Sequence, residues 1–296
     1  MKRIAVLSGG GAKSLIQVSC LAALQSAGKK DYINGYDLFV GSSAGAINSA
    51  MLALRVLTPQ ELLLNYPSML DKIFKKEFFH FVPIYQRSNF QLCWSNLTPI
   101  TTKFGECKTK CVISSVDACE DTTHFFKSWE PEDGQRLAMG VVEKSFAAPL
   151  YFGQINDYTE QKVWYDGGCG YYNLPIDYAY TEAQLLGWVG SEEVIIEAYG
   201  TGYSDELVPF SRASKNNFFE QLWQFMVPGD GGMARSQSRL DQVRKMTKIA
   251  STLKNIHFEY YDIKIPKKLD QMDDTKHKIE YAEFGKQMAE KPLISI

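Results

Sequence analysis

Two short apolar segments lie within the first 55 residues, and each is followed by glycines and then by a helical pattern. Residues 3–8 are largely apolar and run into three consecutive glycines, after which residues 14–27 have apolar side chains at helical spacing. The order then repeats, with a strand expected over 36–41 and a helix over 44–55. Uninterrupted apolar strands are typical of buried parallel sheets. This strand-helix alternation predicts an α/β fold with a mostly parallel central sheet.

The rest of the chain continues this alternation less regularly. A helix is expected to begin at Pro59, because Thr58 can cap it and Glu61 can complete a capping box. Residues 74–94 fit neither a helix nor a strand and are interpreted as an insertion over the sheet. Further strands are expected at 110–116, 124–126, 162–165, 194–199 and 257–265, and further helices at 133–147, 214–226, 233–254 and 276–290.

We find no internal repeat or linker in the sequence. It therefore predicts one domain over residues 1–296, with a motif-bearing core over 1–202 and a helical C-terminal part over 203–296.

Charge and apolar patterning argue against several classes of protein. The 32 Lys and Arg residues balance 34 Asp and Glu residues, so no overall basic field would hold nucleic acid. No apolar run approaches the roughly 20 residues of a spanning helix, so any membrane contact is expected to be peripheral. The six cysteines contain no C-x-x-C pair, and the N-terminus does not resemble a secretory signal. We expect a cytoplasmic protein with reduced thiols and neither a metal nor a cofactor.

Ser43 occupies the centre of a G-x-S-x-G sequence that runs from Gly41 to Gly45. Its position between an expected strand and an expected helix is that of a nucleophile elbow. The turn is so tight that a Cβ at either glycine would collide with a neighbouring strand or helix. The backbone N–H of Ala44 would lie at a helix start, where negative charge is favoured. The sequence predicts Ser43 as the nucleophile of an acyl hydrolase, and a glycine-rich turn with an incidental serine is the alternative.

The glycines at positions 9 to 11 offer unhindered backbone N–H groups that could face an anion. A P-loop does not fit, because Leu7 and Ala12 stand where its glycines should be. A dinucleotide-binding fingerprint fails at Ser14, which occupies the position of its third glycine. We therefore expect an oxyanion hole, in which Gly10 and Gly11 are the main donors. The complete expected set is Gly9, Gly10, Gly11 and Ala44.

A base for Ser43 is harder to find among the four histidines. In α/β-hydrolases the histidine follows the acid in the sequence, which leaves His257 and His277, and both settings are more typical of structural or solvated side chains. Asp166 instead ends an expected strand and is followed by Gly167 and Gly168, as expected for a carboxylate in an active site. A second Asp-Gly-Gly sequence, at 230–232, lies in an expected loop, and its aspartate is the alternative to Asp166 as the catalytic carboxylate.

Taken together, these motifs resemble those of the patatin-like phospholipase family, in the family's order and over residues 3 to about 202. The main matches are Gly9-Gly10-Gly11-Ala12-Lys13, the serine elbow from Gly41 to Gly45, and Asp166-Gly167-Gly168. Secondary matches are Ser145-Phe146-Ala147-Ala148-Pro149-Leu150-Tyr151-Phe152, Asn173-Leu174-Pro175 and Gly200-Thr201-Gly202. The resemblance implies a three-layer α/β/α fold and a dyad in which Asp166 is the base for Ser43, without a histidine.

The chain departs from the family pattern at two positions of the glycine motif. Lys13 stands where arginine is common, and Ser14 stands where glycine is common. Lys13 keeps the positive charge but lacks the planar donor fork of arginine. We expect Lys13 to contact substrate, and a surface lysine at a helix start is the alternative.

The resemblance implies a lipid acyl hydrolase that acts on phospholipids or other acyl lipids, as a phospholipase A or lysophospholipase, through an acyl-enzyme. An acyltransferase or thioesterase could use the same intermediate. A non-catalytic lipid-binding protein is the third alternative, although it would have no reason to retain both Ser43 and Asp166. Aromatic side chains of 74–94, including Phe78 and Phe79, either enter a lipid headgroup layer or cover the sheet edge. Apolar residues of 218–226 either belong to the core or line an acyl channel or lid.

Overall fold

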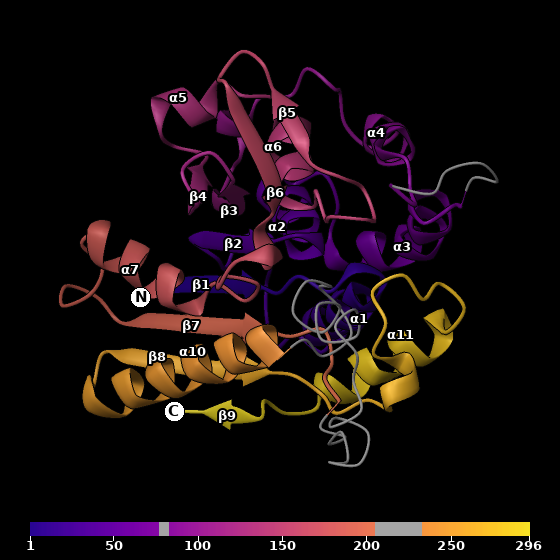
Figure 1. Ribbon diagram of the computed structural model, residues 1–296. Helices are drawn as coiled ribbons and strands as arrows, with labels where there is room; N and C mark the ends of the chain where they lie inside the picture. Colours follow the sequence, from indigo (N-terminus) through magenta and orange to yellow (C-terminus); the bar gives the residue numbers. More distant parts are fainter. Residues whose placement is uncertain (77–82, 205–232) are drawn as a thin grey trace, which may run out of the picture.

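The computed structural model describes residues 1–76, 83–204 and 233–296. Its centre is a sheet of nine strands drawn from these residues (Figure 1). Five neighbouring strands run parallel in the order β3, β2, β1, β7, β8. Their bounds are Lys2–Leu7 for β1, Leu38–Ser42 for β2, Lys110–Asp117 for β3, Val194–Tyr199 for β7 and Ile256–Tyr261 for β8. The predicted α/β fold with a mostly parallel sheet is confirmed.

Antiparallel strands complete both margins of the sheet. They are β4 (Thr122–Lys127), β5 (Ile155–Asp157), β6 (Lys162–Asp166) and β9 (Ile294–Ser295). In the register of the sheet, Ser42 at the end of β2 lies opposite Ser114 of β3, and the next residue of β3, Ser115, lies opposite Asp166 of β6. Strand β3 therefore brings the ends of β2 and β6 together, although 123 residues separate Ser43 from Asp166.

Helices cover both faces of the sheet. Alternate residues of a strand point to opposite faces, and in the central strands both sets are apolar and need to be covered. Ala5 and Leu7 of β1 pack into the larger apolar cluster, whereas Ile4 and Val6 pack into the smaller one. The larger cluster includes residues of α1 (Ser14–Ser26), α2 (Ala44–Ala53), α3 (Pro59–Ile73), α4 (Arg87–Ser95), α6 (Ala138–Ser145) and α11 (Lys278–Met288). The smaller cluster includes α7 (Ile176–Leu185) and α10 (Met233–Thr252). The result is the expected three-layer α/β/α architecture.

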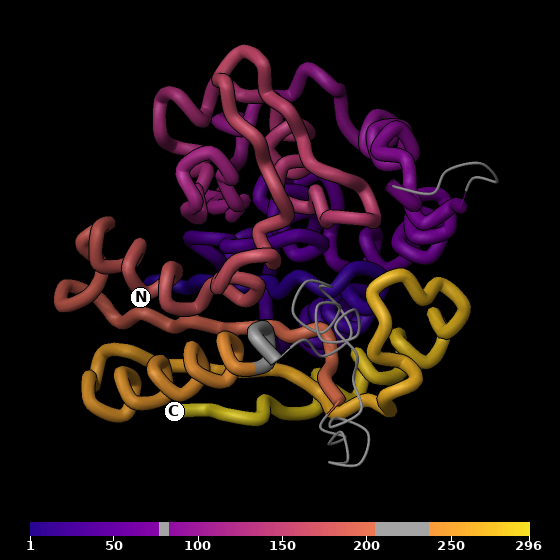
Figure 2. The backbone as a smooth tube through the Cα atoms, viewed as in Figure 1, coloured from indigo at the N-terminus to yellow at the C-terminus, as the bar shows by residue number. Residues whose placement is uncertain are grey.

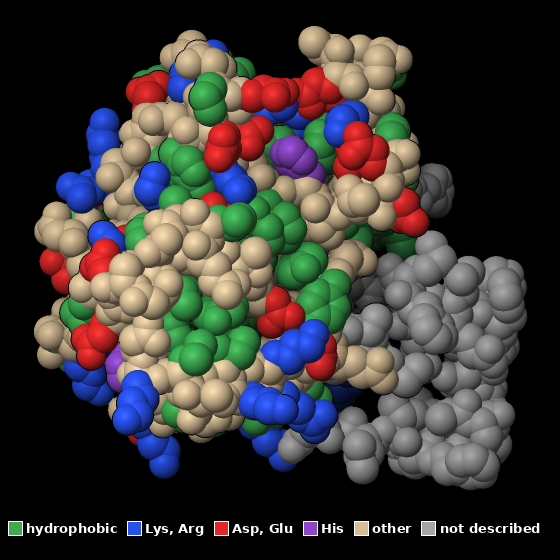
Figure 3. Space-filling model, turned by 90° about the vertical axis from the view of Figure 1, so that its left-hand side faces the viewer, with side chains coloured by type: hydrophobic (Ala, Val, Ile, Leu, Met, Phe, Trp, Pro, Cys, Tyr) green, Lys and Arg blue, Asp and Glu red, His purple; other side chains and the backbone are tan. Residues whose placement is uncertain are grey.

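The path of the chain places its first strand at the centre of the molecule. Figure 2 shows the indigo N-terminal segment passing between the magenta segments above it and the orange and yellow segments below. On the face drawn in Figure 3, acidic and basic side chains are interspersed, in keeping with the net charge of -2. Within the described ranges, no helix combines the length and apolar character that a membrane crossing requires.

The prediction of one continuous helix over 133–147 is wrong, since two separate helices, α5 (Pro131–Gly134) and α6, stand in its place. A distant segment breaks the helix. Leu137 forms an antiparallel bridge with Lys103, and the N–H of Ala138 donates to the carbonyl of Thr102 at 2.9 Å. These contacts hold Leu137 in an extended conformation, which a continuous helix excludes.

Two helices were not expected from the sequence. Helix α4 begins within the segment interpreted as irregular, and it buries Phe90, Cys93 and Trp94 at helical spacing. Helix α7 begins directly after Pro175 and carries Asp177 in its first turn, where the helix dipole favours an acidic residue, which is a signal for a helix N-terminus. By contrast, the capping box of Thr58 and Glu61 at the start of α3 is confirmed. The helix expected over 214–226 lies outside the described residues, as do Phe78 and Phe79.

Candidate active site

Ser43 forms the sharp turn between the end of β2 and the start of α2. Its backbone angles are φ 53° and ψ −125°, a region that side chains rarely adopt and that stores strain at functional sites. A Cβ at Gly41 would overlap the carbonyl oxygen of Gly45 and the hydroxyl of Ser49, and a Cβ at Gly45 would overlap the carbonyl oxygen of Leu7. The two glycines therefore allow α2 to pack against the ends of β1 and β2, as the elbow motif predicts.

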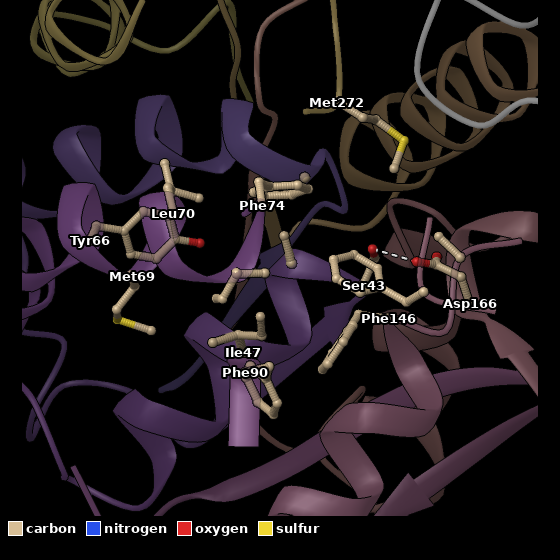
Figure 4. Close-up of a pocket in the computed structure, with 15 residues that line it drawn as sticks. Ser43, Ile47, Tyr66, Met69, Leu70, Phe74, Phe90, Phe146, Asp166 and Met272 are labelled. Atoms are coloured by element: carbon tan, nitrogen blue, oxygen red, sulfur yellow. Dashed lines mark hydrogen bonds between the residues drawn. The ribbon is translucent and has the colours of Figure 1, made fainter. Parts of the chain in front are cut away.

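Asp166 is the last residue of β6, and only 1% of it is exposed. The Oγ of Ser43 donates a hydrogen bond to its Oδ2 at 2.6 Å (Figure 4). The backbone N–H of Gly168 donates to its Oδ1 at 2.7 Å. A Cβ at Gly167 would press on the carbonyl oxygen of Ser114. The glycines after Asp166 thus let the chain turn closely under the carboxylate, whose two oxygens are held in fixed directions.

The last residue of α6 and the segment that follows it support both members of this pair. The backbone N–H of Ser43 donates to the Oγ of Ser145 at 2.9 Å, and the backbone N–H of Asp166 donates to the carbonyl of Ala147 at 3.1 Å. Sequence reasoning included these residues in a secondary motif but gave them no role. Their position in that motif was the signal that could have identified them.

The glycine loop after β1 lies directly against the elbow, since a Cβ at Gly9 would press on the Cβ of Ser43. The N–H of Gly9 donates to the carbonyl of Asn173 at 2.9 Å. The expectation that Gly9 is an oxyanion donor is therefore corrected: its N–H is already used, and its lack of a side chain permits the close approach. The N–H groups of Gly10, Gly11 and Ala44 donate to no described residue outside their own helical turns.

Lys13 differs from both expectations. Its side chain is neither at the surface nor among the residues that line the pocket beside Ser43. The Nζ forms a buried ion pair with Asp270 and approaches the carbonyl of Gly202 at 3.5 Å. The cause is the segment 266–273, which packs against the loop through a hydrogen bond of 2.6 Å from Ala12 N–H to the carbonyl of Met272. Lys13 therefore ties the loop to this segment and does not present its charge to a ligand.

None of the three histidines in the described ranges lines this pocket. The Nε2 of His257 lies 3.8 Å from Glu193 on the exposed side of β8, and the Nδ1 of His277 lies 2.6 Å from Asp274 at the start of α11. His124 packs its ring against Phe126. His80 and the competing carboxylate at 230 lie outside the described residues. Among the expected partners for Ser43 that are described, only Asp166 contacts it.

An apolar pocket, partly open to solvent, extends from Ser43 and Asp166 between α2, α3 and α4 (Figure 4). Tyr66 and Met69 of α3 lie on the side of the pocket away from Ser43. The pocket is lined by Gly11, Ser43, Ala44, Ile47, Tyr66, Met69, Leu70, Ile73, Phe74, Phe90, Phe146, Ala148, Phe152, Asp166 and Met272. Phe74 and Phe90 thus line this pocket, whereas the two alternatives for the 74–94 segment were contact with a lipid headgroup layer and cover over the sheet edge.

Tyr66 adds little polarity to this lining, because its hydroxyl is already bound. Its OH lies 2.6 Å from the Oγ of Ser14, which itself donates to the carbonyl of Gly11 at 2.6 Å. Burial raises the pKa of Tyr66 to about 12, so the phenol stays protonated and can donate to Ser14. The residue that departs from the family pattern at position 14 therefore joins the glycine loop to α3.

Known proteins and solved structures show what this chain is similar to. No curated protein sequence matches it. It is similar to the crystal structure of VipD from Legionella pneumophila, with 12% identity, a TM-score of 0.46, and coverage of 98% of this chain and 66% of VipD. It is also similar to ExoU from the type III secretion system of Pseudomonas aeruginosa, in its complex with SpcU, with 16% identity, a TM-score of 0.34, and coverage of 86% and 53%. This chain thus spans less than two thirds of either protein.

The family model described as patatin-like phospholipase matches residues 5–180, which include the glycine loop, the serine elbow, Asp166 and Asn173. The match begins in β1 and ends within α7, so it contains every element that positions Ser43 and Asp166 in the structure. Because it covers more than half of the sequence, this chain belongs to the patatin-like phospholipase family.

Proposed function

We propose that this protein hydrolyses fatty acyl esters with Ser43 as the nucleophile and Asp166 as its base. The observation that carries the proposal is the hydrogen bond of 2.6 Å from Ser43 Oγ to Asp166 Oδ2, between two side chains that are almost completely buried. In acylation, Ser43 Oγ attacks the ester carbonyl carbon while Asp166 accepts its proton. The tetrahedral intermediate then collapses, the ester C–O bond breaks, and Asp166 returns the proton to the leaving alcohol.

The negative charge of this intermediate needs donors, and the backbone around Ser43 supplies three candidates. The N–H groups of Gly10, Gly11 and Ala44 donate to no described residue outside their own helical turns, while those of Gly9 and Ala12 are used within the protein. The Ala44 N–H also lies at the start of α2, where the helix dipole favours an anion. We propose that these three groups form the oxyanion hole, which stabilises the charge more in the transition state than in the bound ester.

In deacylation, water is the nucleophile and Ser43 is the leaving group. Asp166 accepts a proton from a water molecule that attacks the acyl-enzyme carbonyl, and the proton passes to Ser43 Oγ as the acyl C–O bond breaks. The products are a fatty acid and the free enzyme, and no histidine takes part. We expect the protein to reach lipid substrates by peripheral contact with a membrane or micelle.

The pocket beside Ser43 supports an acyl chain as the part of the substrate that is bound. Its walls are side chains such as Ile47, Leu70 and Phe146, which offer burial to a hydrocarbon chain and no charge. The position of Ser43 at one side of this pocket would place the ester carbonyl between the nucleophile and the loop. We propose phospholipids as the first substrates to test, with phospholipase A or lysophospholipase activity.

Lipid mass spectrometry of a mixed phospholipid extract tests this function most broadly. Wild-type protein should release free fatty acids together with lysophospholipids or deacylated head groups, and the Ser43→Ala variant should release none. Transfer of the acyl group to another alcohol, amine or thiol would instead support an acyltransferase. Equal release by wild type and Ser43→Ala would contradict the proposal.

The acyl pocket can be tested by shortening it. A Met69→Trp substitution would fill the side of the pocket away from Ser43. We expect kcat/KM to fall roughly ten-fold for a long-chain ester and to change little for a short-chain ester, because only the long chain needs the distal space. The matched control is Leu64→Trp on the same helix, at a position that is 80% exposed. Equal losses for both chain lengths would show that Met69 does not bound the acyl site.

A further inference from the structure

Three polar side chains converge on the carbonyl oxygen of Gly9. The Oγ of Ser8 donates to this oxygen at 3.0 Å, the Nδ2 of Asn173 at 3.2 Å, and the Oγ1 of Thr201 at 3.3 Å. Asn173 and Thr201 belong to two motifs, Asn173-Leu174-Pro175 and Gly200-Thr201-Gly202, that take no direct part in the proposed reaction. A carbonyl oxygen has two lone pairs, so three donors around one oxygen are an unusual concentration.

The contacts from Ser8 and Thr201 are buried and the contact from Asn173 is partly buried, and the three side chains come from separate parts of the chain. Thr201 is 6% exposed and follows β7, while Asn173 precedes α7 and also accepts the N–H of Gly9 through its own carbonyl at 2.9 Å. Thr201 packs tightly on the next residue as well, because a Cβ at Gly10 would overlap its side chain. The peptide bond between Gly9 and Gly10 is therefore held from its carbonyl side and has little freedom to rotate.

The orientation of this peptide fixes the direction of the Gly10 N–H. A trans peptide is planar, and its N–H points opposite to its C=O. Donors gathered at the Gly9 oxygen consequently turn the Gly10 N–H away from Asn173 and Thr201. Hydrogen bonds to the carbonyl also polarise the amide, which makes its N–H a stronger donor.

We propose that Asn173 and Thr201, assisted by Ser8, are positioning residues that aim and strengthen the Gly10 N–H as an oxyanion donor. They act through the Gly9 carbonyl and touch no reacting atom. This inference rests on the proposed function, since it concerns the charge that develops when Ser43 attacks an ester. It gives the two motifs a shared physical role in the same reaction.

Thr201→Val is the most selective test, because it removes the hydroxyl and keeps the shape of the side chain. Loss of a whole oxyanion donor lowers the rate about 10² to 10³-fold, so a weakened donor should lower kcat for p-nitrophenyl butyrate roughly ten-fold. We expect KM to change less than about two-fold, because the donor acts mainly in the transition state. Thr201→Ser should restore kcat. Thr109→Val is the control, since Thr109 is similarly buried at 7% exposure and does not contact the loop.

A transition-state probe separates positioning from a loss of structure. An alkyl trifluoromethyl ketone forms an oxyanion adduct with an active-site serine, and its affinity should fall by the same factor as kcat in Thr201→Val and, independently, in Asn173→Ala. The thermal midpoints of Thr201→Val and Thr109→Val should agree. Unchanged kcat and unchanged ketone affinity in both loop variants would overturn the inference, and so would equal losses in Thr109→Val. Failure of the proposed function itself would be seen separately, as undiminished hydrolysis by Ser43→Ala.

Discussion

The serine elbow and the glycine loop lie side by side at the ends of β2 and β1, but different parts of the chain hold them. The turn of the elbow depends largely on its own sequence, because Gly41 lets the chain close on Gly45 and Ser49. Its distant contacts are fewer: Gly45 packs on Leu7, and the N–H of Ser43 donates to Ser145. The loop takes its hydrogen bonds from distant residues, among them Thr201, which is 192 residues away from Gly9. A short motif can therefore specify the backbone of the elbow, whereas the function of each loop residue depends on the completed fold.

The pair at the elbow should produce the largest effect on activity. Asp166→Asn removes the proton acceptor and keeps the size of the side chain, so kcat for an ester should fall roughly 10³-fold. Steady-state kinetics with a soluble short-chain ester would measure this loss. His257→Ala combined with His277→Ala is the control and should leave kcat close to wild type. A large loss in the histidine variant with little loss in Asp166→Asn would indicate a triad of the α/β-hydrolase type.

Lys13 tests whether the loop is held by long-range contacts. Lys13→Met removes the buried partner of Asp270 and leaves it with the more distant Lys267, whose Nζ lies 4.0 Å away, so the free energy of unfolding should fall by about 3 kcal/mol. Denaturant unfolding would measure it, and the double variant Lys13→Met, Asp270→Leu should recover most of the loss. A substrate-binding lysine would behave differently: Lys13→Met would raise KM for an anionic phospholipid but not for an uncharged ester, with stability unchanged.

The capping box at the start of α3 is a feature encoded locally, like the elbow, but it lies away from the pocket. Thr58→Ala removes the hydroxyl that accepts the N–H of Glu61 at 3.2 Å. We expect a loss of about 1 kcal/mol in the free energy of unfolding and no change in kcat. Thermal or denaturant unfolding, together with the ester assay, would check both. A fall in kcat larger than the loss of stability explains would mean that the start of α3 is coupled to the site.

The sequence predicted those features that depend on neighbouring residues. The strand over 194–199 was predicted with its observed bounds, because β7 is an apolar run, interrupted only by Glu197, that ends at glycine. The strand expected over 257–265 continues past the real end of β8 at Tyr261. There the side chain of Asp262 accepts the N–H of Ile263 and of Gly202, both at 2.9 Å, and the second of these contacts comes from a distant loop.

The same distinction separates the candidate site residues. Ser43 and its flanking glycines were identified from five consecutive residues, and the pairing with Asp166 was implied by the family resemblance. The place of Lys13 could not be predicted, because its partner Asp270 lies 257 residues away and nothing near either residue indicates the pair. The N–H of Gly9 was assigned wrongly for a related reason, since the acceptor at Asn173 becomes its neighbour only when α7 packs beside β1.

Covalent labelling of the nucleophile tests the central claim most directly. A fluorophosphonate reacts with a serine that a neighbouring base and an oxyanion hole have activated. We expect one adduct on the wild-type protein, mapped to Ser43 by peptide mass spectrometry, and no adduct on Ser43→Ala under the same conditions. Labelling that persists in Ser43→Ala, or an adduct mapped to another residue, would contradict the assignment of Ser43 and with it the proposed reaction.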